Sequence, residues 1–356
     1  MTERSERGGS HRDDRGGRGY RGGSGGGDRG YRGGSGGVRG GGGRGGDRGY
    51  RGGDRGYRDG ERGRSRRVYD DEPRDGLLAD LVGHLHALDG RSYAAYKAIV
   101  GRYRAPAGWF LHVDRVQADP YAPPTRIHVD VPTDLHGLEL LDEADLLADA
   151  DRRLAVGDFL TRELHAGFRG TALSIASPGQ EILQRSSIIV RPDEKKEGPG
   201  WVLEIRARLA LPAQGRSIQG HEASRIVGRD LVRELEEAMD LTGERGDRLV
   251  RHIVTLEDHR ALTATVARNG WVSFLADGSV LPRRSGVSDE PLDGGVPLEA
   301  PDSMAATVEL PHAGTVRGTV VEAGVNVIVG GGYHGKSTLL SAIERGVYPH
   351  VPGDGR

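Results

Sequence analysis

The chain has 356 residues, enough for two ordinary domains, and a formal net charge of −2 at pH 7. It contains no cysteine, which excludes disulfide bridges, thiolate zinc sites and a cysteine nucleophile. No apolar run approaches the roughly 20 residues that span a bilayer, and the N-terminus lacks the apolar segment of a signal peptide. These features predict a cytoplasmic protein with no membrane partner.

The first 72 residues differ from the remainder in composition and charge. They carry 18 Arg against 12 Asp and Glu, whereas the rest of the chain carries 32 Lys and Arg against 40 Asp and Glu. The unit Arg-Gly-Gly recurs, and the longer unit Asp-Arg-Gly-Tyr-Arg begins at Asp28, Asp47 and Asp54. Glycine maximises backbone entropy, and almost no aliphatic residue offsets the cost of ordering it. Residues 1–72 are therefore expected to form a disordered Arg/Gly/Tyr-rich (RGG) arm.

Two interpretations of this arm remain open. Arginine can contact phosphates, tyrosine can stack on bases and glycine lets a chain follow an irregular ligand, so the composition favours binding of RNA or another single-stranded nucleic acid. Alternatively, residues 1–72 are a solubilising tail, because the interleaved acidic residues dilute its positive charge.

After the arm, apolar residues at helical spacing predict a helix over 77–88 that ends at Asp89-Gly90. A second helical stretch is expected over 93–103, with Ala94, Ala98 and Ile99 on its buried side. Two β-prone runs bounded by Pro or Asp predict strands over 109–113 and 126–131. His84 and His86 lie two residues apart and diverge on a helix, so they make a poor metal-binding pair.

The next elements are a helix over 151–165 and an antiparallel strand pair over 188–191 and 201–211. In the second of these strands Glu204, Arg206 and Arg208 share one face, which is expected to face solvent. A long helix over 221–239 follows, and Thr242-Gly243 is expected to begin a linker.

A second unit is expected beyond this linker. It should begin with a helix over 248–258, followed by a hairpin of strands 272–275 and 279–281. Asp277-Gly278 lies between these two strands, and Asp-Gly is a strong hairpin signal. Two more strands are predicted over 306–310 and 315–321.

The segment Gly330-Gly-Gly-Tyr-His-Gly-Lys-Ser337 fits the pattern G-x-x-x-x-G-K-[ST] of a phosphate-binding loop. Upstream, the apolar run Val325–Val329 predicts a buried strand. Downstream, residues 338–345 predict a helix with Leu339, Leu340 and Ile343 facing a sheet. Strand, glycine-rich loop and helix N-terminus together direct backbone N–H groups and a favourable dipole at phosphates.

This pattern predicts an ATP and Mg²⁺ site. Lys336 should reach the β- and γ-phosphates, the Ser337 hydroxyl should ligate Mg²⁺, and Thr338 should contact the α-phosphate. A general-base role for His334 is disfavoured, because such loops hold phosphates mainly through main-chain groups. The complete set of candidate ligand-binding residues is Gly330, Gly331, Gly332, Tyr333, His334, Gly335, Lys336, Ser337 and Thr338.

Phosphoryl transfer also needs a strand that presents a carboxylate to Mg²⁺ and a residue that positions water. Only about a dozen residues follow the predicted helix, and none forms an apolar strand ending in Asp or Glu. No catalytic residue is therefore assigned, and the chain is expected to be C-terminally truncated, with hydrolysis restricted to a full-length form.

Five stretches of the sequence resemble the family of predicted ATPases of the ABC class, and the resemblance covers 77–356. They are Asp89-Gly-Arg-Ser-Tyr-Ala-Ala-Tyr-Lys97, Pro178-Gly-Gln-Glu-Ile-Leu183, Leu211-Pro-Ala-Gln-Gly-Arg216, Leu281-Pro-Arg-Arg-Ser-Gly286 and Gly330-Gly-Gly-Tyr-His-Gly-Lys-Ser-Thr-Leu-Leu340. The resemblance implies ATP binding, an N-terminal domain and an ABC-type nucleotide-binding domain. It also implies that the full-length protein works as a homodimer.

The expected fold class is therefore mixed α/β and α+β. An α+β N-terminal domain over 73–241 should follow the arm, and residues 242–356 should form the opening part of a P-loop (ABC-type) α/β domain. The alternative function is that of an RNA-binding or single-stranded nucleic-acid-binding protein whose nucleotide site is regulatory or vestigial.

Overall fold

The computed structural model describes residues 74–194, 196 and 200–356. The arm predicted over residues 1–72 lies outside the described residues. The described part is a mixed α/β structure with one large hydrophobic core and one small one.

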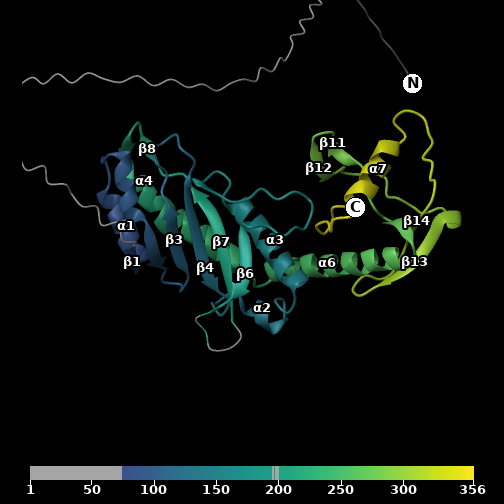
Figure 1. Ribbon diagram of the computed structural model, residues 1–356, viewed down its shortest axis with the longest axis horizontal. Helices are drawn as coiled ribbons and strands as arrows, with labels where there is room; N and C mark the ends of the chain where they lie inside the picture. The colour runs from purple at the N-terminus through teal and green to yellow at the C-terminus, as the bar shows by residue number, and fades with distance from the viewer. Residues whose placement is uncertain (1–73, 195, 197–199) are drawn as a thin grey trace, which may run out of the picture. The chain divides into compact units, whose positions relative to one another are not determined.

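A seven-stranded sheet organises the N-terminal part (Figure 1). Its strands are β1 (Arg74–Leu77), β2 (Gly101–Arg104), β3 (Phe110–Arg115), β4 (Thr125–Pro132), β5 (Leu173–Ser174), β6 (Ile188–Pro192) and β7 (Trp201–Leu209). The order is β1-β2-β3-β4-β7, and both β5 and β6 pair with β7. Only the β1–β2 pair is parallel among the described strands of this sheet.

Helices and a short hairpin connect these strands. They are α1 (Leu78–Ala87), the 3₁₀ helix η1 (Tyr93–Ile99), α2 (Glu139–Glu143), α3 (Ala150–Gly167), β8 (Ala213–Gln214), β9 (Ser217–Ile218), α4 (Gly220–Arg225), the π-helical turn η2 (Ile226–Asp230) and α5 (Leu231–Met239). Alternate residues of β4 and β7, such as Val129 and Ile205, are buried in the large core. The charged residues between them lie on the other face of the sheet.

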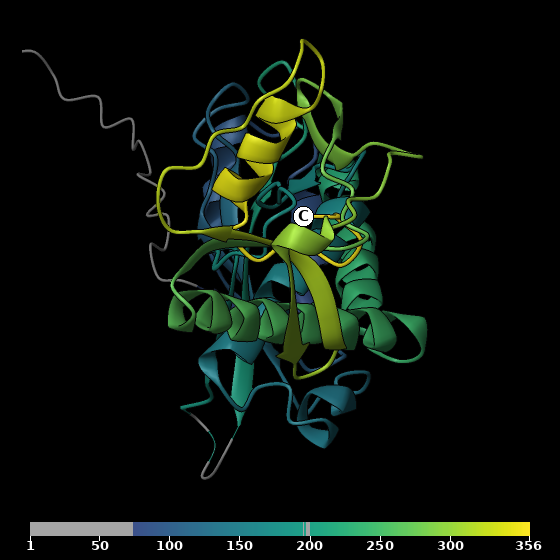
Figure 2. The same cartoon turned by 90° about the vertical axis from the view of Figure 1, so that its right-hand side faces the viewer.

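The chain then continues into helix α6 and a smaller sheet. These elements are α6 (Glu244–Arg268), β10 (Trp271–Ala276), β11 (Arg283–Ser285), β12 (Ser288–Pro291), the 3₁₀ turn η3 (Asp302–Met304), β13 (Ala305–Leu310), β14 (Gly314–Glu322) and α7 (Lys336–Arg345). Strands β10, β14 and β13 form an antiparallel sheet in that order, next to the second half of α6 (Figure 2). Strands β11 and β12 form a separate hairpin.

Most of the long predicted elements are confirmed. The helices expected over 77–88, 151–165 and 221–239 correspond to α1, α3 and the continuous α4–η2–α5 segment. Strands β6 and β7 form the predicted antiparallel pair, with the charged face that the alternation indicates. Strands β13 and β14 also match their predictions.

Residues 93–103 do not form the single predicted α-helix. A 3₁₀ helix with 3.0 residues per turn covers Tyr93–Ile99, so Tyr93, Tyr96 and Ile99 share the buried face. Ala94 is exposed and Ala98 half-buried, so the expected burial was wrong for both. Strand β2 follows immediately, and the sequence pattern did not distinguish it.

No extended linker follows Thr242-Gly243, because α6 begins at Glu244 and runs for 25 residues. The first half of α6 packs on α3, and Leu249, Ile253 and Leu256 belong to the large core. The helix predicted over 248–258 is therefore the middle of a much longer one.

The predicted hairpin at Asp277-Gly278 is wrong in its pairing. The tight turn exists, since Gly278 has φ +86° and the Ser279 N–H donates to the Ala276 carbonyl. However, β10 pairs with β14, and the backbone after the turn bonds to Leu298 instead. The turn signal is local, whereas the strand partner is decided by residues some 40 positions later.

The strand predicted over Val325–Val329 is also absent. These residues have no regular secondary structure, and Val325 and Val329 are 96% and 82% exposed. A β-strand is ordered by hydrogen bonds to neighbouring strands, and no described strand pairs with this run. The helix expected after the loop is confirmed as α7, with Leu339 and Ile343 against the small core and Leu340 exposed.

Candidate functional site

The predicted phosphate-binding loop leads directly into helix α7. Gly335 occupies the N-cap position with φ +78°, a left-handed conformation that glycine adopts without a steric penalty. The first hydrogen bond of the helix runs from the Leu339 N–H to the Gly335 carbonyl at 2.8 Å. No side chain caps this end of the helix, so its first-turn N–H groups can bind an anion.

The side chain of Lys336 folds back over the loop. Its Nζ donates to the carbonyl of Gly330 at 2.9 Å and to that of Gly331. Within the described part of the chain, no carboxylate pairs with this ammonium group. The positive charge therefore lies within the loop, bound only by neutral carbonyls that a phosphate could replace as partners.

The side chain of His334 forms a hydrogen bond within the loop. Its Nδ1 accepts a hydrogen bond from the Gly331 N–H at 3.1 Å. This contact fits an organising role in the loop. Tyr333, the adjacent residue, is fully exposed at φ +63°.

The remaining predicted site residues follow in order. Ser337 is exposed and Thr338 is half-buried, and both lie in the first turn of α7. The structure thus brings Lys336, His334, Gly330 and Gly331 into contact. Ser337 and Thr338 lie beside these residues because they follow Lys336 in the first turn of α7.

The segment after α7 is fixed by a buried charge cluster that the sequence analysis did not single out. Asp354 is 2% exposed and accepts a hydrogen bond from Arg283 Nη1 at 2.8 Å. Its other carboxylate oxygen lies 2.8 Å from His350 Nδ1. The sequence did contain an indication of this cluster, because Arg283 lies in one of the stretches that carry the family resemblance.

Residues 178–183, another of the stretches that carry the family resemblance, also bond to the segment after α7. The Ile182 N–H donates to the Pro349 carbonyl at 2.8 Å, and the Val351 N–H donates to the Gln180 carbonyl at 2.9 Å. Glu181 pairs with Arg345, the last residue of α7, at 2.7 Å. The C-terminal end of the helix that carries the phosphate-binding loop is therefore bonded to residues 178–183.

Two further stretches of the resemblance, residues 89–97 and 211–216, contact each other. Tyr93 and Tyr96 donate their hydroxyls to the carbonyls of Leu211 and Pro212 at 3.3 and 2.9 Å. The Tyr93 N–H donates to the Arg216 carbonyl at 2.9 Å. Burial raises the pKa of Tyr93 to about 12, so its hydroxyl stays protonated and continues to donate.

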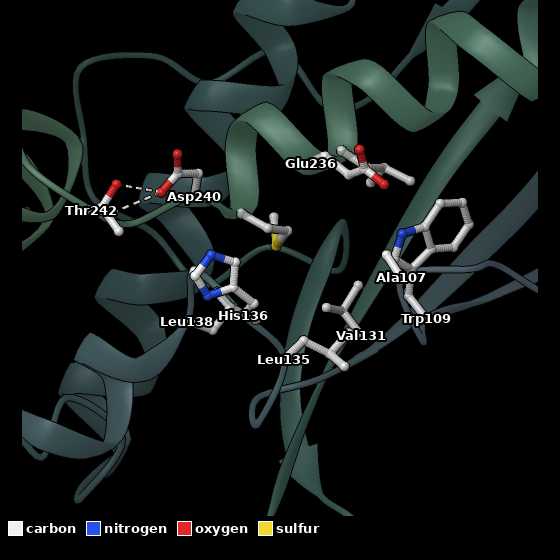
Figure 3. A pocket seen from close by; sticks show the side chains of 12 residues that line it. Ala107, Trp109, Val131, Leu135, His136, Leu138, Glu236, Asp240 and Thr242 are labelled. Atoms are coloured by element: carbon white, nitrogen blue, oxygen red, sulfur yellow. Dashed lines mark hydrogen bonds between the residues drawn. The ribbon is translucent and has the colours of Figure 1, made fainter.

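Two cavities lie in the N-terminal part of the described chain. One of about 470 Å³ is lined mainly by apolar residues between the end of β4, the loop after it and α5 (Figure 3). Trp109 lines it, and its indole nitrogen is buried without a hydrogen-bond partner. A second cavity of about 750 Å³ opens on the charged face of the sheet and includes Arg115, Arg126, Arg206 and Arg208.

No described helix has the length and apolar character needed to cross a bilayer. Two family models match the chain. The model described as "ATPase of the ABC class N-terminal" matches residues 78–241, and the P-loop domain model ABC_ATPase matches residues 245–356. No curated protein matches the sequence.

Proposed function

The chain belongs to the ATPases of the ABC class, and on that basis we propose that residues Gly330–Thr338 bind ATP together with Mg²⁺. The observation that carries the proposal is the position of Lys336 over a loop that ends at an uncapped helix N-terminus. An ammonium group and free N–H donors at one place are suited to a triphosphate.

The roles follow from the chemistry of each group. Lys336 exchanges its carbonyl partners for the β- and γ-phosphates, because a charge-assisted bond to phosphate is stronger than a bond to a neutral carbonyl. The Ser337 hydroxyl, exposed at the helix start, ligates Mg²⁺. Thr338 contacts the α-phosphate. His334 keeps the loop in shape through its bond to Gly331.

Substitution of Lys336 tests this proposal. Lys336→Ala should weaken Mg-ATP binding at least tenfold, since a charged hydrogen bond contributes roughly 1.5–3 kcal/mol. Isothermal titration calorimetry on the whole chain measures the effect. Lys97→Ala is the matched control, because Lys97 is an exposed lysine of η1 with no contact to the loop. Equal affinities for the wild type and Lys336→Ala would rule out this phosphate site.

We also propose a second function, binding of single-stranded RNA by residues 1–72, supported by the repeated Arg, Gly and Tyr composition. Deletion of these residues should remove most RNA affinity and leave the thermal unfolding of the remainder unchanged. Binding by the intact chain should fall steeply with salt, because phosphate contacts release counterions. Undiminished RNA binding by the shortened chain would instead identify the arm as a solubilising tail.

A further inference from the structure

Two histidines lie side by side on the charged face of the N-terminal sheet. His112 of β3 is the direct cross-strand partner of His128 of β4. Their rings stack with centroids 4.1 Å apart and planes 11° apart. Asp130 lies two residues after His128 on the same strand, so the strand alternation places its side chain on the same face.

These three side chains form a compact set of potential ligand atoms. One nitrogen from each histidine and one carboxylate oxygen of Asp130 all lie within 4.8 Å of one another. His112 Nε2 lies 3.6 Å from Asp130 Oδ2, which is too long for a hydrogen bond. The three side chains are about 20% exposed, so the set is largely desolvated.

Two further observations indicate that this set is incomplete as a hydrogen-bond network. His112 Nε2 has no exposed surface and no hydrogen-bond partner, and such an unpaired buried nitrogen needs an explanation. His128 Nδ1 lies 2.9 Å from Asp114 Oδ2. A proton held on Nδ1 by this carboxylate leaves the lone pair of His128 on Nε2, which is the arrangement that a metal-binding histidine requires.

We propose that His112, His128 and Asp130 bind a divalent transition-metal ion of the zinc type, with Asp114 as the carboxylate that orients His128. Two imidazoles and a carboxylate suit zinc, whereas Mg²⁺ and Ca²⁺ prefer oxygen ligands only. Three protein ligands leave the fourth tetrahedral position open for water or an anion. The basic cavity of about 750 Å³ is lined by His128 and Asp114 together with arginine side chains.

The orientation of Asp130 also fits this site. Arg191 Nη2 donates to Oδ1 at 2.9 Å, which leaves Oδ2 on the side of His112.

The test is a titration of the whole chain, without nucleotide, with Zn²⁺ and with Co²⁺. We expect one Zn²⁺ per chain by calorimetry and the visible absorption of tetrahedral Co²⁺. His112→Ala and His128→Ala should each weaken binding by more than about a hundredfold, since removal of an orienting outer residue alone costs 10–100-fold. Asp114→Asn should weaken metal binding by only about 10–100-fold and leave the Co²⁺ spectrum unchanged.

The matched control is His86→Ala. His86 Nε2 lies 2.6 Å from His221 Nδ1 in an exposed pair, another place where two described imidazoles could share a metal. Circular dichroism and thermal unfolding confirm that each variant folds. Binding that is lost in His86→Ala and retained in His112→Ala would overturn the proposal. So would a wild-type chain that takes up no Zn²⁺.

Discussion

Asp158 is a carboxylate buried inside the N-terminal part, and three nitrogen-bearing side chains surround it. Arg162 Nε lies 2.7 Å from one oxygen and Arg185 Nε lies 3.2 Å from the other. The buried His252 of α6 is the third, at 3.2 Å. Burial raises the pKa of Asp158, but the hydrogen bond from His252 and the charge of Arg162 outweigh burial and hold the pKa below its ordinary value.

Removal of this carboxylate should strongly destabilise the fold. We expect Asp158→Ala to lower the free energy of unfolding by about 3–5 kcal/mol, because the arginines then lose their buried counter-ion. Urea unfolding followed by circular dichroism measures the change. Asp151→Ala is the control, since Asp151 pairs with Arg260 on the surface and should contribute less than about 1 kcal/mol. Similar losses in both variants would contradict this account.

His259 predicts a pH dependence of stability. Burial lowers its pKa below the ordinary 6.5, which outweighs the hydrogen bond to the Gly346 carbonyl. The unfolded chain therefore takes up this proton first as the pH falls. The stability contributed by neutral His259 is complete above pH 6.5 and decreases below it. The free energy of unfolding should decrease as the pH falls below about 6.5, and His259→Gln should flatten that decrease. An unchanged slope in the variant would exclude His259 as the cause.

At the scale of elements, a buried ion pair helps to hold the segment 346–356. Arg283→Ala removes the partner of Asp354 and should increase hydrogen exchange in residues 346–356 and in the end of α7. Arg284→Ala provides a closely matched control. Arg284 is adjacent to Arg283 in the sequence, but its side chain pairs with exposed Glu290 and Asp293. Equal exchange in the two variants would show that Arg283 does not hold the segment.

The elements also show what the sequence could predict. Helical periodicity located α1, α3 and α5, because each buries one face in the core. The loop at 330–338 was found because its groups are contiguous. The proposed metal site of His112, His128 and Asp130 was not, since it depends on the register between β3 and β4. Val325–Val329 was misassigned because composition indicates a preference for strand but does not supply its partner strands.

At the scale of the whole molecule, the two hydrophobic cores differ greatly in size. The large core includes most of the buried residues before 257, whereas the small one contains only Leu275, Leu281 and Ala342 as fully buried members. Residues 322–335 are exposed throughout. We expect hydrogen exchange to be fastest at 322–335 within the described residues and slowest in β4 and β7.

Hydrogen exchange also tests where the nucleotide binds. Mg-ATP should slow exchange at 330–338 in the wild type and leave it unchanged in Lys336→Ala. Slow exchange at 322–335 without nucleotide would contradict the exposure of this segment. Protection by ATP at some other place would locate the nucleotide elsewhere.

The burial of the first half of α6 has a practical consequence for dividing the chain. The family match to the P-loop domain begins at residue 245, yet Leu249, Ile253 and Leu256 are at most 2% exposed against the preceding part. A fragment expressed from 245 would carry these residues as an uncovered apolar stripe about two turns long, a surface that promotes aggregation. A fragment ending at 241 would lose three side chains from its core and His252, one of the three partners of Asp158. Expression boundaries that keep both fragments soluble should therefore leave 244–257 with the N-terminal fragment.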